Sequence, residues 1–139
     1  MRKKSTKNKY YYFISLVELL IKVVPTITQM IYDFLKEKVS TNPQTKVIFT
    51  EHGDTYTWED IDKTSQIIAK ELSELGVKQG SHVGLCSQNS INYIITFFAI
   101  QKLGAFAQLI NNQLKIDELL RLFNSGDVEY FCYGDLNEN

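Results

Sequence analysis

Apolar residues at helical spacing predict two helices in the first third of the chain. Residues 10–24 are apolar except at three positions, which stand three and four apart and would form one narrow polar stripe on a helix. These polar residues are Ser15, Glu18 and Lys22. Pro25 ends this helix, and a second one begins near Thr26 or Thr28. Its apolar stripe consists of Ile27, Met30, Ile31, Phe34, Leu35 and Val39.

A β-hairpin and a third helix are predicted next. After an Asn-Pro turn at 42–43, residues 46–50 and 54–57 have the composition of strands and flank a short turn. Thr57, followed three residues later by an aspartate, resembles a capping box and starts a helix. This helix ends at Gly76, because glycine adopts a left-handed conformation there without steric cost. Its apolar face consists of Ile61, Ile68, Ala69, Leu72 and Leu75.

Strands and helices alternate from residue 82 onward. Short apolar strands are predicted at 82–86, 105–110 and 128–133, separated by helices over 91–104 and 117–123. The first of these helices is apolar on nearly every side, which is typical of an interior helix. This alternation indicates parallel strands with right-handed crossovers and a sheet covered on both faces. The predicted fold class is therefore α/β: a β-hairpin followed by a βαβαβ parallel layer, with an extra apolar helix at the N-terminus.

Composition and charge are those of one globular domain with a basic tail. The 139 residues are 44% hydrophobic and 22% charged, which excludes wholesale disorder. The first nine residues hold five of the fifteen basic residues and no acid, so the remaining ten basic residues face sixteen acids, a net charge of −6. An acidic body argues against nucleic-acid binding. The cysteines, Cys86 and Cys132, are too few for a disulfide framework, so a reducing, cytoplasmic location is expected.

The apolar segment at residues 10–24 leaves three interpretations open. At ~1.5 Å per residue it would be roughly 22 Å long, short of the ~30 Å needed to cross a bilayer. Glu18 and Lys22 interrupt it and no signal-peptidase site follows before Pro25, which disfavours an ordinary signal peptide. One interpretation is an interfacial helix that gives residues 1–24 a peripheral membrane contact. The second is a helix docked on the rest of the protein, and the third is an uncleaved or atypical signal.

Few residues stand out as candidates for chemistry. Ser87, Asn89 and Ser90 follow a predicted strand and precede a helix, where α/β proteins place ligands, although Asn89 or Ser90 as a helix cap explains the pattern equally well. No glycine-rich phosphate-binding motif follows a predicted strand. Three further groups have structural explanations. They are the histidines His52 and His82, the core-strand cysteines Cys86 and Cys132, and the acids Glu59, Asp60 and Asp62 in the first turn of a helix.

Several short motifs, taken in order, resemble one family. Residues 57–62, Thr-Trp-Glu-Asp-Ile-Asp, resemble the Thr-Tyr-x-Glu-Leu-Asp motif of the AMP-forming adenylating enzymes, which include acyl-CoA synthetases, luciferases and peptide-synthetase adenylation domains. Residues 76–80 are similar to the Gly-Val-x-x-Gly-Asp motif of that family, and residues 102–105 to its Lys-x-Gly-Ala motif. Weaker matches are Asn42-Pro43, Asn89, Glu118-Leu119 and Asn124-Ser125-Gly126. The departures are Ser81 for an aspartate, Asn92 for a frequent glutamate, and Leu109 and Asn112 for common prolines.

The resemblance implies which part of such an enzyme the chain represents. It runs from about Thr28 to Tyr133 and covers only the opening portion of the family's enzymes. It implies two parts: a basic tail and apolar helix over 1–25, and over 26–139 a partial AMP-binding domain that stops before the ATP-binding loop. We therefore expect no catalytic, cofactor-binding or metal-binding residue in this chain. ATP, Mg²⁺, CoA and a carboxylic-acid substrate are implied only for the complete enzyme.

Three functional hypotheses follow. The first is the N-terminal fragment of an AMP-dependent synthetase or ligase, inactive as an isolated chain. The second is a non-enzymatic interaction module that needs a partner chain, since the strand at 128–133 is expected to expose an edge that the complete enzyme would pair. The third is a small membrane-associated α/β binding protein. Whether the chain is an enzyme at all is left open by its sequence.

Overall fold

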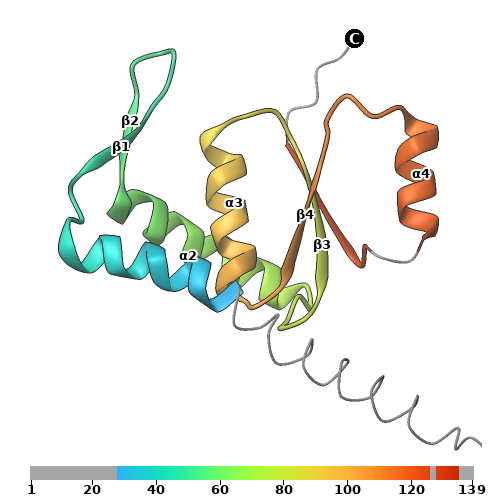
Figure 1. The fold of residues 1–139 in the computed structure, drawn as a ribbon, viewed down its shortest axis with the longest axis horizontal. Coiled ribbons are helices and arrows are strands. Elements are labelled where there is room, and N and C mark those ends of the chain that lie inside the picture. The colour runs from blue at the N-terminus through green and yellow to red at the C-terminus, as the bar shows by residue number, and fades with distance from the viewer. Residues whose placement is uncertain (1–27, 126–127, 135–139) are drawn as a thin grey trace, which may run out of the picture.

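The computed structural model describes residues 28–125 and 128–134 (Figure 1). The predicted apolar helix over 10–24 lies outside these residues. Residues 28–41 are helical. The elements that follow are β1 (Lys46–Phe49), β2 (Thr55–Thr57), α2 (Trp58–Glu74), β3 (His82–Cys86), α3 (Ile91–Lys102), β4 (Phe106–Ile110), α4 (Ile116–Asn124) and β5 (Tyr130–Tyr133). Every predicted element within the described residues is present, in the predicted order.

The start of α2 is fixed by reciprocal hydrogen bonds, as its sequence predicts. The backbone N–H and hydroxyl of Thr57 donate to Asp60 Oδ2 at 2.9 and 2.7 Å, and the Asp60 N–H donates back to Thr57 Oγ1 at 3.2 Å. Strands β1 and β2 pair antiparallel directly before this cap. Since β2 ends at Thr57, the N-cap of α2, the hairpin continues directly into the helix.

The end of α2 corrects one predicted core residue. Leu75 was expected on the apolar face, but it is 73% exposed because the helix ends at Glu74 and the chain reverses at Gly76, whose φ is +103°. The N–H of Val77 donates to the carbonyl of Leu72 at 3.0 Å, which is the six-residue bond of a Schellman cap. Val77, 2% exposed, takes the core position instead.

The sheet that follows is parallel, with strand order β4-β3-β5. One face of it, which includes Val83 and Leu85, packs against α2 and α3 and forms the main core. The other face meets α4, where the Phe123 ring lies edge-on to the Phe131 ring at 5.0 Å. Helices α3 and α4 thus lie on opposite sides of the sheet (Figure 1). Within the described residues β4 and β5 are the edge strands, as expected for β5.

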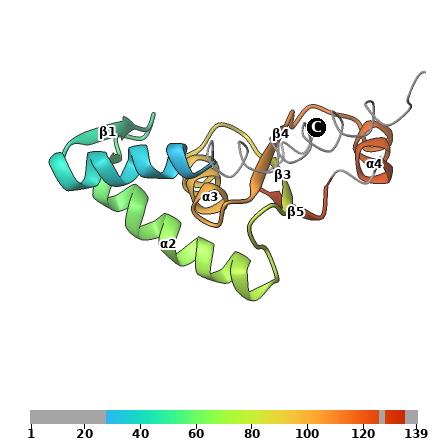
Figure 2. The ribbon, with the colours of Figure 1, turned by 60° about the horizontal axis from the view of Figure 1, so that its bottom comes forward.

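The helix over 28–41 lies beside α2 and reaches α3 (Figure 2). Its predicted apolar stripe is only partly buried: Leu35 is fully buried, whereas Met30 is 64% exposed. Phe34 is also partly exposed and sets its ring edge-on to Trp58 at 5.9 Å. The buried stripe is narrower than the sequence predicts, because the helix packs against the rest of the protein through one narrow side. No helix within residues 28–125 combines the length and the apolar content that crossing a bilayer requires.

Candidate ligand site at the carboxyl ends of β3 and β4

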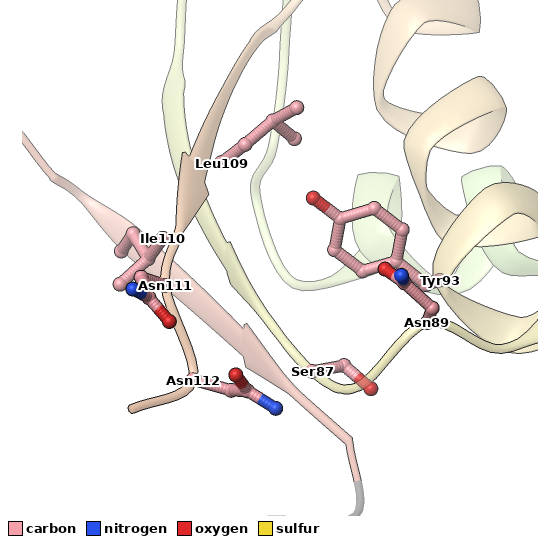
Figure 3. A pocket seen from close by; sticks show the side chains of 7 residues that line it. All are labelled: Ser87, Asn89, Tyr93, Leu109, Ile110, Asn111 and Asn112. Atoms are coloured by element: carbon pink, nitrogen blue, oxygen red, sulfur yellow. The ribbon is translucent and has the colours of Figure 1, made fainter. Parts of the chain in front are cut away.

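A small cavity of about 270 Å³ lies where β3 and β4 end (Figure 3). Its wall combines the loop after β3, the first turn of α3, and the end of β4 with the turn that follows. The lining residues are Ser87, Asn89, Tyr93, Leu109, Ile110, Asn111 and Asn112. Pockets for whole small molecules usually have roughly 300–1,000 Å³, so this cavity has room for part of a ligand.

The topology explains why a cavity forms at this place. After β3 the chain turns to α3 on one side of the sheet, and after β4 it turns to α4 on the other side (Figure 1). The two loops therefore diverge and leave a crevice between the carboxyl ends of adjacent parallel strands. Crevices at such switch points are where open α/β sheets bind ligands.

The chemistry of the lining is neutral hydrogen bonding. Carboxamides come from Asn89, Asn111 and Asn112, and hydroxyls from Ser87 and Tyr93. Asn111 already uses its Oδ1 to accept from the Gln113 N–H at 2.9 Å, which fixes its side chain in the turn. None of the lining side chains is a carboxylate, imidazole, thiol or ammonium group. The cavity can orient a ligand, but its side chains offer no strong acid, base or metal ligand.

The residues predicted from sequence divide between this cavity and the helix cap. Ser87 and Asn89 line the cavity. Ser90 is the N-cap of α3 and accepts from the Tyr93 N–H at 3.2 Å, so the capping explanation holds for Ser90. Asn111 and Asn112 were not singled out as candidate ligand-binding residues. Two adjacent carboxamides directly after an apolar strand are the signal that would have identified them.

The acidic group at the start of α2 is occupied by local contacts. Asp60 belongs to the capping box, where the hydrogen bonds from Thr57 hold the pKa of its carboxyl below the usual value. Contacts with Lys63 at 3.0 Å and Gln44 at 2.7 Å likewise lower the pKa of Glu59. Asp62 accepts from Gln66 at 2.7 Å. Within the described residues no three histidine, cysteine or acidic side chains group in a way that could hold a metal ion.

The histidines and cysteines are spread over the fold. His52 lies in the hairpin turn, and the His82 ring packs on Phe106 with 4.7 Å between centroids. Cys86 is buried in β3 and Cys132 is partly buried in β5. Since Leu85 is the register partner of Cys132, the two thiols point to opposite faces of the sheet. Burial raises the pKa of both thiols and keeps them protonated near neutral pH.

Comparison with known proteins identifies the family to which the chain is related. The model of the AMP-binding enzymes matches residues 35–137. The 2-succinylbenzoate–CoA ligase of Oceanobacillus iheyensis is 35% identical over 96 residues, which are 69% of this chain and 20% of that protein. The long-chain fatty acid transport protein 6 of Mus musculus is 35% identical over 81 residues, 58% of this chain and 13% of its own length.

A solved structure shows the same fold. The N-terminal domain of FACL13 from Mycobacterium tuberculosis superposes with a TM-score of 0.72 at 23% identity, over 78% of this chain and 27% of that one. The chain thus spans about a fifth of the length of the first relative. Its α/β fold is the one found in the N-terminal part of adenylate-forming enzymes. With the family model matching across both the α2 cap and the strands of the crevice, the chain belongs to the AMP-binding enzyme family.

Proposed function

We propose that this chain forms the N-terminal part of an ATP-dependent acid–thiol ligase. Such an enzyme activates a carboxylic acid as an acyl-adenylate and passes the acyl group to a thiol, here CoA. The proposal is supported by the family match and by relatives named as CoA ligases, such as the 2-succinylbenzoate–CoA ligase. ATP, Mg²⁺, the acid and CoA would be bound mainly by residues outside these 139. The part that carries this function is residues 26–139.

The observation that carries the proposal is the family match over residues 35–137, and the lining of the crevice indicates what this chain would contribute. Its carboxamides and hydroxyls can hold and orient a polar ligand, but they carry no positive charge to neutralise a triphosphate and no carboxylate to anchor Mg²⁺. Phosphoryl and acyl-adenylate chemistry depends on cationic groups and metal ions to stabilise developing charge. The chain would therefore contribute the scaffold and the crevice at the ends of β3 and β4. Alone, it would be inactive.

A chimera tests this proposal. Residues 26–139 replace the matching segment of the Oceanobacillus iheyensis 2-succinylbenzoate–CoA ligase, and ATP–pyrophosphate exchange is measured with succinylbenzoate. We expect exchange from the chimera, and none from the 139-residue chain alone or from the ligase lacking that segment. A folded chimera without exchange, or an isolated chain that supports exchange, would contradict the proposal.

A second candidate function is an interaction module completed by a partner chain. It is favoured by the two unpaired edges of the sheet and by exposed side chains on both edge strands, Leu109 at 55% and Tyr133 at 71%. A partner-dependent module should purify together with a larger ligase-like chain and lose solubility without it. Purification of the native protein, followed by intact mass measurement, distinguishes the two functions. The predicted membrane contact of residues 1–24 and the cytoplasmic location remain predictions.

A further inference from the structure

Strand β5 reaches the crevice as well, through the residue that follows it. Cys86 and Tyr133 are the last register partners of β3 and β5. Beyond them, the Gly134 N–H donates to the Cys86 carbonyl at 3.0 Å and extends the parallel ladder by one residue. Gly134 therefore lies beside Ser87, the crevice residue that directly follows β3.

Gly134 and Ser87 approach each other more closely than residues of neighbouring strands normally do. Adjacent strands lie roughly 4.7–4.9 Å apart. A Cβ atom at position 134 would be only 2.9 Å from the Ser87 Cβ and would collide with the Ser87 hydroxyl oxygen. Non-bonded carbon atoms have their best separation at about 3.5–4.0 Å. The Ser87 side chain thus occupies the space that any side chain at position 134 would need.

The backbone conformation does not account for glycine at this position. The glycines with positive φ within the described residues are Gly53, Gly76, Gly80 and Gly104. Gly134 is not among them, so its backbone conformation is open to other amino acids. The neighbouring Ser87 side chain is therefore what excludes a larger residue from position 134.

Ser87 stands where the walls of the crevice meet. It follows the central strand β3, with Asn112 on one side and Asn89 and Tyr93 on the other (Figure 3). Asn111 already uses its Oδ1 within its own turn. By contrast, no hydrogen bond between described residues engages the Ser87 hydroxyl. This hydroxyl is therefore available to a ligand in the crevice.

We propose that Gly134 is a positioning residue of the crevice. Without a side chain at position 134, Ser87 keeps the place from which its hydroxyl lines the cavity and holds a polar group of a substrate. Gly134 does not itself line the cavity, so it acts through Ser87. This inference rests on the proposed function, in which the crevice binds part of a substrate of the complete enzyme.

A methyl group at position 134 would displace Ser87. Rotation about χ1 carries the Ser87 hydroxyl away from the methyl group but leaves the Ser87 Cβ in place, so the backbone of residue 87 must shift too. The hydroxyl then no longer meets the substrate with the same geometry. Loss of one hydrogen bond corresponds to roughly a two- to tenfold loss of affinity.

The chimera that carries residues 26–139 tests this role in the complete ligation reaction. The KM values for ATP, succinylbenzoate and CoA are measured for the unsubstituted chimera and for its Gly134→Ala variant. We expect the KM for the substrate in the crevice to rise roughly two- to tenfold while kcat changes by less than about twofold, because the lost contact is one that the ground state and the transition state share. Three unchanged KM values would overturn the proposal.

Removal of the Ser87 side chain separates positioning from general damage to β5. Ser87→Gly removes both the hydroxyl and the Cβ that a methyl group at position 134 would meet. Ser87→Gly should raise the same KM as Gly134→Ala, and the double variant should raise it no further. If the two effects multiply instead, Gly134→Ala does not act through Ser87 and the proposal fails.

Tyr133→Ala is the matched control on the same strand. Tyr133 directly precedes Gly134, is 71% exposed and does not line the cavity. Tyr133→Ala should leave all three KM values unchanged. A rise equal to that of Gly134→Ala would show that any change at the end of β5 has this effect, which would contradict a specific role of Gly134.

The stability of the full chain provides a test that does not depend on activity. Gly134→Ala should lower the urea midpoint, because its methyl group meets Ser87. In the Ser87→Gly background the same substitution should leave the midpoint unchanged or raise it, because alanine restricts the unfolded chain more than glycine does. An equal decrease in both backgrounds would show that the two residues are not in contact and would overturn the proposal.

Failure of this inference and failure of the proposed function give different results. An unsubstituted chimera that folds but shows no exchange refutes the proposed function, and the urea midpoints then decide whether Gly134 positions Ser87. An active chimera whose KM values do not respond to Gly134→Ala refutes the positioning role alone.

Discussion

At the scale of single residues, the reciprocal bonds between Thr57 and Asp60 are the interaction with the clearest energetic meaning. Replacement of an N-cap threonine by alanine costs about 1 kcal/mol, within a range of roughly 0.5–2 kcal/mol. We therefore expect Thr57→Ala to lower the free energy of unfolding by about 1 kcal/mol, measured by urea denaturation of the full chain. Thr64→Ala is the matched control, because Thr64 donates only to the Asp60 carbonyl of its own helix at 2.8 Å.

The control distinguishes capping from a general effect of losing a threonine. Alanine has a higher helix propensity than threonine, so Thr64→Ala should change stability by less than about 0.5 kcal/mol or increase it. Similar destabilisation by both substitutions would show that the Thr57 bonds are not what stabilises the start of α2.

The same cap predicts a dependence of stability on pH. Hydrogen bonds from Thr57 lower the pKa of Asp60 in the folded state, so the folded carboxyl stays ionised to lower pH than the unfolded one. The stabilisation is fully present above the unfolded pKa of about 3.9 and is lost as pH falls through the folded value. Asp60→Asn should therefore flatten the loss of stability between about pH 5 and pH 3. The urea midpoints of both proteins are measured across this pH range. If the midpoint of Asp60→Asn falls with pH as steeply as that of the unsubstituted chain, Asp60 does not have this role.

At the scale of elements, the helix over 28–41 is held by one side rather than by its whole apolar stripe. Leu35 is fully buried, whereas Met30, in the same predicted stripe, is 64% exposed. Truncating a buried leucine to alanine costs roughly 2–5 kcal/mol. Leu35→Ala should thus destabilise the chain by at least about 2 kcal/mol and Met30→Ala by less than about 1 kcal/mol, as measured by urea denaturation. Comparable losses from the two variants would mean that Met30 is covered in solution.

Periodicity predicts elements well because each apolar position reports a buried face, but it does not say where that face ends. The end of α2 shows this limit: Leu75 continues the spacing, yet the Schellman turn at Gly76 moves Val77 into the core. Helix α3 was predicted as interior because it is apolar nearly all round, and it carries four buried residues in twelve. Where a helix ends, and which of its faces is buried, depends on tertiary contacts that a local sequence pattern does not reveal.

The candidate site was less predictable than the fold for a related reason. Ser87 and Asn89 could be placed at a strand end from local pattern alone. That they share a crevice with Asn111 and Asn112 depends on β4 lying beside β3 and on α3 and α4 lying on opposite sides of the sheet. This arrangement joins loops more than twenty residues apart. The sequence therefore predicts a strand end suited to ligands, but not its second wall.

At the scale of the whole molecule, the arrangement of the sheet determines which parts are most exposed to reaction. β3 is paired on both sides, whereas β5 is paired on one side within the described residues. Cys86, 1% exposed, belongs to β3, and Cys132, only partly buried, belongs to β5. A probe of the central strand must await opening of the whole sheet, whereas a probe of the edge strand needs only local opening.

The two thiols therefore provide a test of how the sheet opens. We expect iodoacetamide to alkylate Cys132 faster than Cys86 under native conditions, followed by peptide mass spectrometry. Because burial raises the pKa of both thiols, both rates should rise as pH increases from 7 to 9, since the thiolate is the reacting form. Leu35→Ala lowers global stability but does not alter the sheet edge. It should therefore increase the alkylation rate of Cys86 more than that of Cys132. If Cys86 reacts first, or if the variant accelerates both thiols equally, β5 does not open independently of β3.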